Sequence, residues 1–376
     1  MEPRTVGVEE ELLVVDPATR AVTPRAREVL QAHAARHDDE ELDQELFRHQ
    51  LEIRTEPFRD VGELVRQLVA ARQAAAEAAE VHDLSVAVCA TVPLGVEEPE
   101  VTPDDRYRDV VGRYGAIALL GTTCGMHVHV AVESDDEGVG CIDRIAPWLP
   151  ALLAMSVNSP FVRGRDTGYA SWRTQQWSTW PSAGPTEPFG SVEGYRRACR
   201  RMIASGAARD SAMLYFDARL SDKQPTVEVR ILDAVTDQDD VGLLTALVRA
   251  LVETAVLQWS RGVAPSAWRS EELRAARWRA SRYGLSSDLL DPRDHELRPA
   301  REVVGALVAL VGEWLDVAGD SDRVEAGVER VLAGTGATHQ HAAYERTGSL
   351  EGVVDDLLAR TTESWTSRSV PSPEGP

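Results

Sequence analysis

Four short segments of the chain alternate apolar residues with charged or imidazole side chains. They cover residues 6–12, 50–54, 124–130 and 226–231. Successive side chains of a β-strand point to opposite faces of its sheet. In the third segment, Val128 and Val130 therefore face one way, while His127 and His129 face the other. The pattern predicts strands with one apolar face and one face of Glu, His and Arg.

Longer patterns predict the other elements. Residues 61–80 place Val61, Leu64 and Leu68 on one face of a helix, and residues 238–259 follow the same period. Further strands are expected at 84–91 and 212–220, and further helices at 143–157, 191–205, 270–283, 300–317, 321–332 and 349–361. Strands dominate early and helices dominate the last third. This order predicts an α+β fold, a mostly antiparallel sheet with helices packed on its apolar face.

Residues 158–190 show no period and are rich in Gly, Pro, Ser, Thr and Trp. A structureless loop of this length inside a compact domain is usually functional. We therefore expect this segment to act as a lid. We also expect residues 1–362 to form a single domain and residues 363–376 to be a disordered C-terminal tail.

Composition narrows the class of protein. The chain has 376 residues, of which 43% are hydrophobic and 27% charged, as in ordinary globular proteins. Its formal net charge of −21 argues against nucleic-acid and anionic-membrane partners. The four cysteines form no Cys-x-x-Cys pair, and the N-terminus carries no apolar signal core. Reduced thiols and a cytoplasmic location are therefore expected, and no apolar run reaches the ~20 residues of a membrane span.

The lysine content also bears on nucleotide binding. Lys223 is the only lysine, and it lies in the run Ser-Asp-Lys-Gln-Pro. A P-loop requires a lysine inside a glycine-rich loop, so a site of that type is excluded. We expect nucleotide phosphates to be bound instead by arginines, metal ions or backbone N–H groups.

The polar strand faces indicate metal chemistry. Glu9 and Glu11 are two residues apart, so both point into the same space, where a shared cation would relieve their repulsion. Mg²⁺ prefers carboxylate oxygens and often bridges to substrate phosphates. The further candidate ligands are Glu52, Glu228 and either His127 or His129.

Three arginines are candidates for anion binding. Arg230 lies beside Glu228 on one strand face and could neutralise a phosphoryl group in transfer. Arg165 and Arg173, in the long loop, could bind a carboxylate or phosphate through two N–H groups. Each motif alone is also typical of a solvated strand face or a cross-strand ion pair. From the residues alone, a metal–phosphate site and an ordinary polar surface both stay open.

Together these segments resemble the carboxylate–amine ligase family, also called glutamate–cysteine ligase type 2. The matching runs are residues 7–12, 50–52, 124–129, 158–161, 166–173, 228–233 and 334–340. The resemblance covers nearly the whole chain. The family is similar in fold to glutamine synthetase, whose active site lies on a curved antiparallel sheet, and the same fold is implied here.

The resemblance also implies roles for individual residues. The Mg²⁺ ligands would be Glu9, Glu11, Glu52, His127 and Glu228, with two or three ions and Mn²⁺ as a substitute. His129 and Arg230 would lie near the ATP phosphates, and Arg173 would face the γ-phosphate or the acid substrate. Arg230 and Arg173 are thus the expected catalytic residues, and Arg165 is a further expected ATP-binding residue.

The implied reaction is ATP-dependent amide formation. The γ-carboxylate of L-glutamate would form γ-glutamyl phosphate, and an amine, L-cysteine or another, would displace phosphate. A homodimer is implied by the resemblance only. Three alternatives stay open: a phosphagen-type guanidino kinase, a non-catalytic protein that binds ATP or an amino acid, and a two-metal hydrolase.

Overall fold

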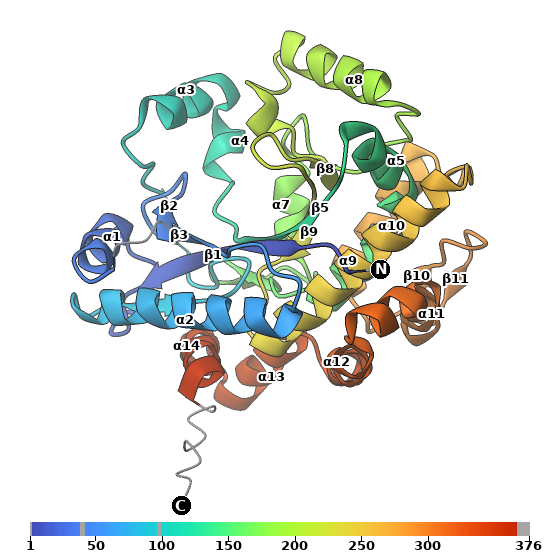
Figure 1. Cartoon of the computed structure of the whole chain (residues 1–376). Helices are drawn as coiled ribbons and strands as arrows, with labels where there is room; N and C mark the ends of the chain where they lie inside the picture. The colour runs from blue at the N-terminus through green and yellow to red at the C-terminus, as the bar shows by residue number, and fades with distance from the viewer. Residues whose placement is uncertain (1, 38–41, 96–98, 367–376) are drawn as a thin grey trace, which may run out of the picture.

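A computed structural model describes residues 2–37, 42–95 and 99–366 (Figure 1). Its main sheet has the order β2-β3-β1-β5-β9-β8, with β4 paired to β1, and the pairs are antiparallel. These strands are β1 (Val6–Val15), β2 (Leu42–Gln44), β3 (Gln50–Arg54), β4 (Ser85–Ala87), β5 (Gly125–Ala131), β8 (Ala218–Leu220) and β9 (Thr226–Asp233). The four alternating segments of the sequence are therefore the four neighbouring strands β3, β1, β5 and β9, and the antiparallel sheet is confirmed.

Helices cover the apolar face of this sheet. The helices α2 (Val61–Glu80), α6 (Leu149–Ser156) and α9 (Gln238–Ser260) contact its central strands. The strand residues Val8, Val128 and Val229 are at most 2% exposed beneath them. Helix α2 has the predicted bounds, because Asp60 caps it by accepting a hydrogen bond from the Glu63 N–H.

The C-terminal helices form a further layer behind α2 and α9 (Figure 1). Their bounds are α11 (Ala300–Ala318), α12 (Ser321–Ala333), α13 (Gly336–Thr347) and α14 (Leu350–Thr366). One large core cluster includes residues from Val6 to Leu357. Helix α14 continues to Thr366, beyond the expected domain end at residue 362, and residues 367–376 lie outside the described residues. Among the described helices, none is long and apolar enough to cross a membrane.

The remaining elements are short and lie mainly around the polar face and the edges of the sheet. The helices are α1 (Ala26–Ala34), α3 (Asp105–Tyr114), α4 (Ala116–Leu119), α5 (Asp135–Ile145), α7 (Trp172–Trp177), α8 (Val192–Ala204) and α10 (Ser270–Tyr283), with 3₁₀ turns η1 (Ala146–Trp148) and η2 (Ser211–Met213). Two small hairpins pair β6 (Phe161–Val162) with β7 (Arg165–Asp166) and β10 (Leu289–Leu290) with β11 (Leu297–Arg298).

Two sequence predictions were wrong about local structure. The helix predicted at 143–157 is split into α5, η1 and α6, because Pro147 and Pro150 each lack the N–H that a continuous helix needs. The segment 158–190 is not structureless, since it contains β6, β7 and α7. Ser171 caps α7 by accepting a hydrogen bond from the Thr174 N–H, a signal that the loop composition concealed.

Candidate active site

The strand register brings the predicted site residues together on the polar face of the sheet. It places three pairs of side chains on directly opposed positions: Glu9 and His127, Glu11 and Glu52, His129 and Glu228. A bulge in β9 at Arg230 and Ile231 shifts the register, so that Asp233 pairs with Gly125. As a result, Asp233 and Arg230 lie on the polar face although they are three residues apart.

These side chains line a cavity of about 470 Å³. All seven residues predicted on the four strands contribute to it: Glu9, Glu11, Glu52, His127, His129, Glu228 and Arg230. The sequence analysis did not single out other lining residues, which come from turns, from α3 and from the strands β3 and β8: Glu45, Arg54, Arg106, Tyr107, Tyr215 and Arg219. Arg54 follows the alternation of β3 with Glu52, whereas no periodic pattern marks Glu45 or the residues of α3, so only the folded chain reveals these.

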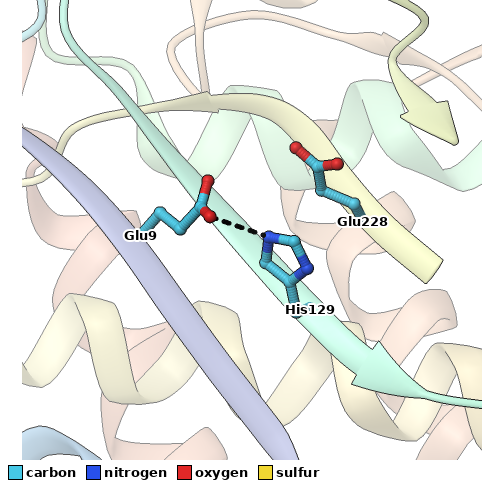
Figure 2. A group of neighbouring side chains, drawn as sticks. All are labelled: Glu9, His129 and Glu228. Atoms are coloured by element: carbon cyan, nitrogen blue, oxygen red, sulfur yellow. Dashed lines mark ion pairs between the residues drawn. The ribbon is translucent and has the colours of Figure 1, made fainter. Parts of the chain in front are cut away.

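Glu9, His129 and Glu228 form a candidate metal-binding group (Figure 2). One ligand atom from each lies within 4.8 Å of the other two. The His129 Nδ1 is 2.9 Å from the Thr226 hydroxyl oxygen, whereas its buried Nε2 has no hydrogen-bond partner among the described residues and is 3.6 Å from a Glu9 oxygen. If Nδ1–H donates to Thr226, the Nε2 lone pair is free to bind a cation. The donor set therefore fits a divalent ion.

The candidate group contains His129 and not His127, and the place of His127 in the predicted ligand set stays a prediction. His127 Nδ1 is 3.2 Å from a Glu9 oxygen and 3.4 Å from the Arg230 guanidinium. Burial, together with that neighbouring cation, lowers the pKa of His127 to about 4. The bulge in β9 places Arg230 beside His127, and alternation along the strand could not indicate this neighbour.

A second group of carboxylates lies in the same cavity. Burial raises the pKa of Glu11 to about 7, that of Glu45 to about 7 and that of Glu52 to about 8, and repulsion among these groups adds to the shift. Carboxylate oxygens are the ligands that Mg²⁺ prefers, so these three side chains are candidate ligands, although Glu52 also forms an ion pair with Arg54. Glu45, which the sequence analysis did not single out, belongs to this group.

Two arginines keep Glu228 ionised. The Arg219 Nε is 2.7 Å from one Glu228 oxygen, and Arg230 forms an ion pair with the other. Burial alone would raise the pKa of Glu228, but Arg230 and then Arg219 lower it below its usual range. The Arg230 Nε is buried and has no acceptor among the described residues, so one N–H of this side chain is available to an anion.

Arg173 does not line the cavity, in contrast to its predicted contact with phosphate or the acid substrate. It is 3% exposed, and its guanidinium lies near the carbonyl oxygens of Arg230 and Ile231, at 3.3 and 3.4 Å. It passes so close to Gly125 that a Cβ there would lie 2.2 Å from Nη2. Arg173 therefore lies buried on the polar side of the sheet, where α7 is also found (Figure 1), and it supports the bulge of β9 next to Glu11.

Arg165 is also outside the cavity. It is exposed on β7, and the tight turn at Arg163 and Gly164, with φ of 48° and 78°, directs this hairpin to the surface. The predicted contact of Arg165 with ATP therefore has no support in the arrangement of the described residues.

The expected lid is tied to the sheet through Asp233, which is fully buried. One carboxylate oxygen accepts hydrogen bonds from the Asn158 N–H at 2.9 Å and the Ser159 hydroxyl at 2.7 Å. The other accepts from the Ser171 hydroxyl at 2.8 Å. Farther along, Trp177 and Trp180 line the cavity. These contacts hold the first part of the segment against the sheet, and its later part forms a wall of the site; a role as a lid stays a prediction.

Solved structures share this fold. A glutamate–cysteine ligase from Francisella tularensis, solved in complex with AMP, superposes with a TM-score of 0.73 over 99% of this chain and 91% of its own, at 12% identity. A bifunctional glutathione synthetase from Pasteurella multocida gives a TM-score of 0.68 over 96% of this chain and 53% of its own, at 14% identity. At such identities the likeness shows the fold alone.

Relatives found by sequence have a much higher identity to this chain than these solved structures have. A Nocardioides sp. (strain ATCC BAA-499 / JS614) protein, provisionally named glutamate–cysteine ligase 2-1, is 55% identical over 370 residues, covering 96% of this chain and 97% of the relative. A Streptomyces coelicolor protein, provisionally named glutamate–cysteine ligase 2, is 46% identical over 362 residues, covering 95% and 99%. The family model for glutamate–cysteine ligase family 2 matches residues 5–359. The chain therefore belongs to the glutamate–cysteine ligase family 2.

Proposed function

We propose that this protein is an ATP-dependent carboxylate–amine ligase that joins the γ-carboxylate of L-glutamate to the amine of L-cysteine or a related compound. Family membership supports the reaction class. The observation that carries the proposal is the convergence of Glu9, His129 and Glu228 in one cavity, with a second carboxylate group beside them. Such a site suits a nucleotide bound through divalent cations.

Glu9, His129 and Glu228 fit one Mg²⁺ ion and would hold it. Glu11, Glu45 and Glu52 line the same cavity and supply carboxylate oxygens for any further ion. When bound, these ions neutralise the polyphosphate and lower the cost of charge redistribution in transfer.

The remaining residues orient the reactants. In the first step, a γ-carboxylate oxygen of glutamate bonds to the γ-phosphorus of ATP, and the bond from that phosphorus to ADP breaks. In the second, the amine nitrogen bonds to the acyl carbon, the acyl carbon–oxygen bond breaks, and phosphate and a proton leave. Arg230 lines the cavity and is suited to stabilise charge on the phosphoryl oxygens. The wall that includes Trp177 and Trp180 limits access of water to the acyl phosphate.

The test is to incubate the protein with ATP, Mg²⁺ and L-glutamate, with and without L-cysteine, and to measure ADP and γ-glutamyl product. The turnover rate of Glu228→Gln should be about 100-fold or more below that of the unaltered protein, because the carboxylate charge that orients Arg219 and Arg230 is removed. Glu9→Gln is a second variant that leaves these arginines paired. Glu329→Gln, at an exposed ion pair on α12, is the matched control and should keep full activity.

The outcomes separate the alternatives. Cysteine-dependent ADP and a γ-glutamylcysteine product support the proposal, and glutamate-dependent ADP without this dipeptide directs the search to other amines. Transfer of phosphate to a guanidine without amide formation would indicate a kinase, and turnover without ATP a hydrolase. ATP binding without any turnover would indicate a non-catalytic protein and overturn the ligase proposal.

A further inference from the structure

Nearly all the cationic side chains around the cavity are already engaged with carboxylates. Among the described lining residues, the four arginines form ion pairs: Arg54 with Glu52 and Asp43, Arg106 with Asp210, and both Arg219 and Arg230 with Glu228. Lys223 also lines the cavity, is exposed, and has no carboxylate partner among the described residues. The one lysine of the chain is thus the lining cation left available for a substrate.

The position of Lys223 indicates which substrate group it meets. It lies in the turn between β8 and β9, which is closed by a hydrogen bond from the Ser221 N–H to the Thr226 carbonyl at 3.0 Å. Thr226 begins β9, and its hydroxyl is the partner of His129. The turn therefore stands at the end of the cavity that holds Glu9, His129 and Glu228, and away from the end where Glu11 meets Gly125.

The charges near this turn leave the ammonium group free. Asp222, the adjacent acid, accepts a hydrogen bond from the Ser211 hydroxyl at 2.8 Å, and this bond holds its carboxylate toward η2. A lysine ammonium is a compact charge on a flexible four-carbon stem, so it can follow a phosphate group over several ångströms. Lys223 therefore lines, without a carboxylate partner among the described residues, the same cavity as the candidate metal-binding group.

We propose that Lys223 binds a phosphate group of the nucleotide next to the Glu9–His129–Glu228 group and thereby sets nucleotide affinity. The inference rests on the proposed use of ATP. Sequence reasoning had set Lys223 aside because it lies outside a glycine-rich loop. In the folded chain, the turn between β8 and β9 places Lys223 at the cavity, so it can bind phosphate without a glycine-rich loop.

Binding of MgADP and of L-glutamate, each measured by isothermal titration calorimetry without turnover, tests the proposal. Lys223→Met should weaken MgADP binding about fivefold at low salt, Lys223→Arg less than twofold, and neither should change L-glutamate binding. Arg274→Met is the matched control, because Arg274 is exposed on α10 outside the cavity and should bind both ligands as the unaltered protein does.

The single lysine allows an independent measurement. In the full-length protein, acetylation by an amine-selective reagent can be followed by mass spectrometry at Lys223 and at the N-terminal amine. MgADP should slow acetylation of Lys223 but not of the N-terminus. Unchanged MgADP affinity in Lys223→Met overturns the proposal, and so does a loss confined to L-glutamate, which would assign Lys223 to the carboxylate instead. Both results are independent of whether an amide product is ever formed, so they do not depend on the ligase assay.

Discussion

At the residue scale, the role of a side chain in the site depends on whether it already has a partner. Glu10 illustrates this on the apolar face of β1, where it is fully buried and forms an ion pair with Arg72. Arg72 also donates to the carbonyl oxygens of Val235 and Thr236. Glu10 is therefore structural, because alternation along β1 turns it to the apolar face, although it stands between two candidate ligands.

His49 gives a residue-scale prediction for pH dependence. It is 2% exposed and stacks on Phe47, and burial lowers its pKa to about 4. Below the unfolded-state pKa of about 6.5, the unfolded chain binds a proton that the folded chain does not bind until about pH 4. The contribution of His49 to the free energy of unfolding is therefore constant above about pH 6.5 and falls as the pH decreases toward 4. Between pH 7.5 and pH 5 the free energy of unfolding should decrease by about 2 kcal/mol through this residue.

Urea unfolding at pH 7.5 and pH 5 checks this expectation. His49→Gln removes the titrating group, so its loss of stability on acidification should be about 2 kcal/mol smaller than that of the unaltered protein. His37→Gln is the comparison, since His37 is only partly buried. Equal losses for the unaltered protein and His49→Gln would contradict the assignment.

At the element scale, Asp233 joins the end of β9 to the segment that leads into α7. Its carboxylate accepts three hydrogen bonds from Asn158, Ser159 and Ser171, and the Arg173 guanidinium is 4.0 Å away. One side chain thus links the wall of the cavity to the strand that carries Glu228 and Arg230. The order of the segment depends on this link more than on regular secondary structure.

Asp233→Asn should therefore loosen the wall. The amide cannot accept all three hydrogen bonds, so we expect a loss of about 2–3 kcal/mol in stability, because buried donors are left unpaired. Hydrogen exchange in residues 158–171 should become faster. Asp288→Asn, at an exposed position, is the matched control and should show neither effect. Equal stability of the two variants, with unchanged exchange, would show that other contacts hold the wall.

At the scale of the whole molecule, the fold brings carboxylates from distant parts of the chain to one cavity. Six carboxylates line one cavity in a chain of net charge −21, and three of them have a raised pKa. Binding of divalent cations should therefore stabilise the folded state by mass action. At 100 times the dissociation constant this is about 2.7 kcal/mol, or roughly 4 °C in melting temperature for a chain of this size.

Thermal unfolding in MgCl₂, compared with NaCl at the same ionic strength, measures this effect. Glu9→Gln should lose most of the Mg²⁺-specific shift, because a ligand of the candidate group is removed. The NaCl series corrects for general screening of the net charge. Identical shifts in the two salts would show that no specific cation site exists.

Much of this architecture follows from local pattern. Period-two alternation in β1, β3, β5 and β9 and period 3.6 in α2 and α9 predicted the central strands, the covering helices and the polar face. These signals are readable because they depend on neighbours along the chain. The break at Pro147 also had a local cause, but the apolar run around it masked the signal.

The tertiary structure decided which side chains meet. The bulge in β9 brought Arg230 to His127, the packing of α7 buried Arg173 against that bulge, and turns brought Glu45 and Lys223 to the cavity. Strand order, register shifts and turn directions depend on contacts between distant segments, which no window of sequence contains. The sequence by itself determined which chemical groups lie on the polar face. The fold decided which partner each of these side chains has, and therefore which groups remain available to bind ligands.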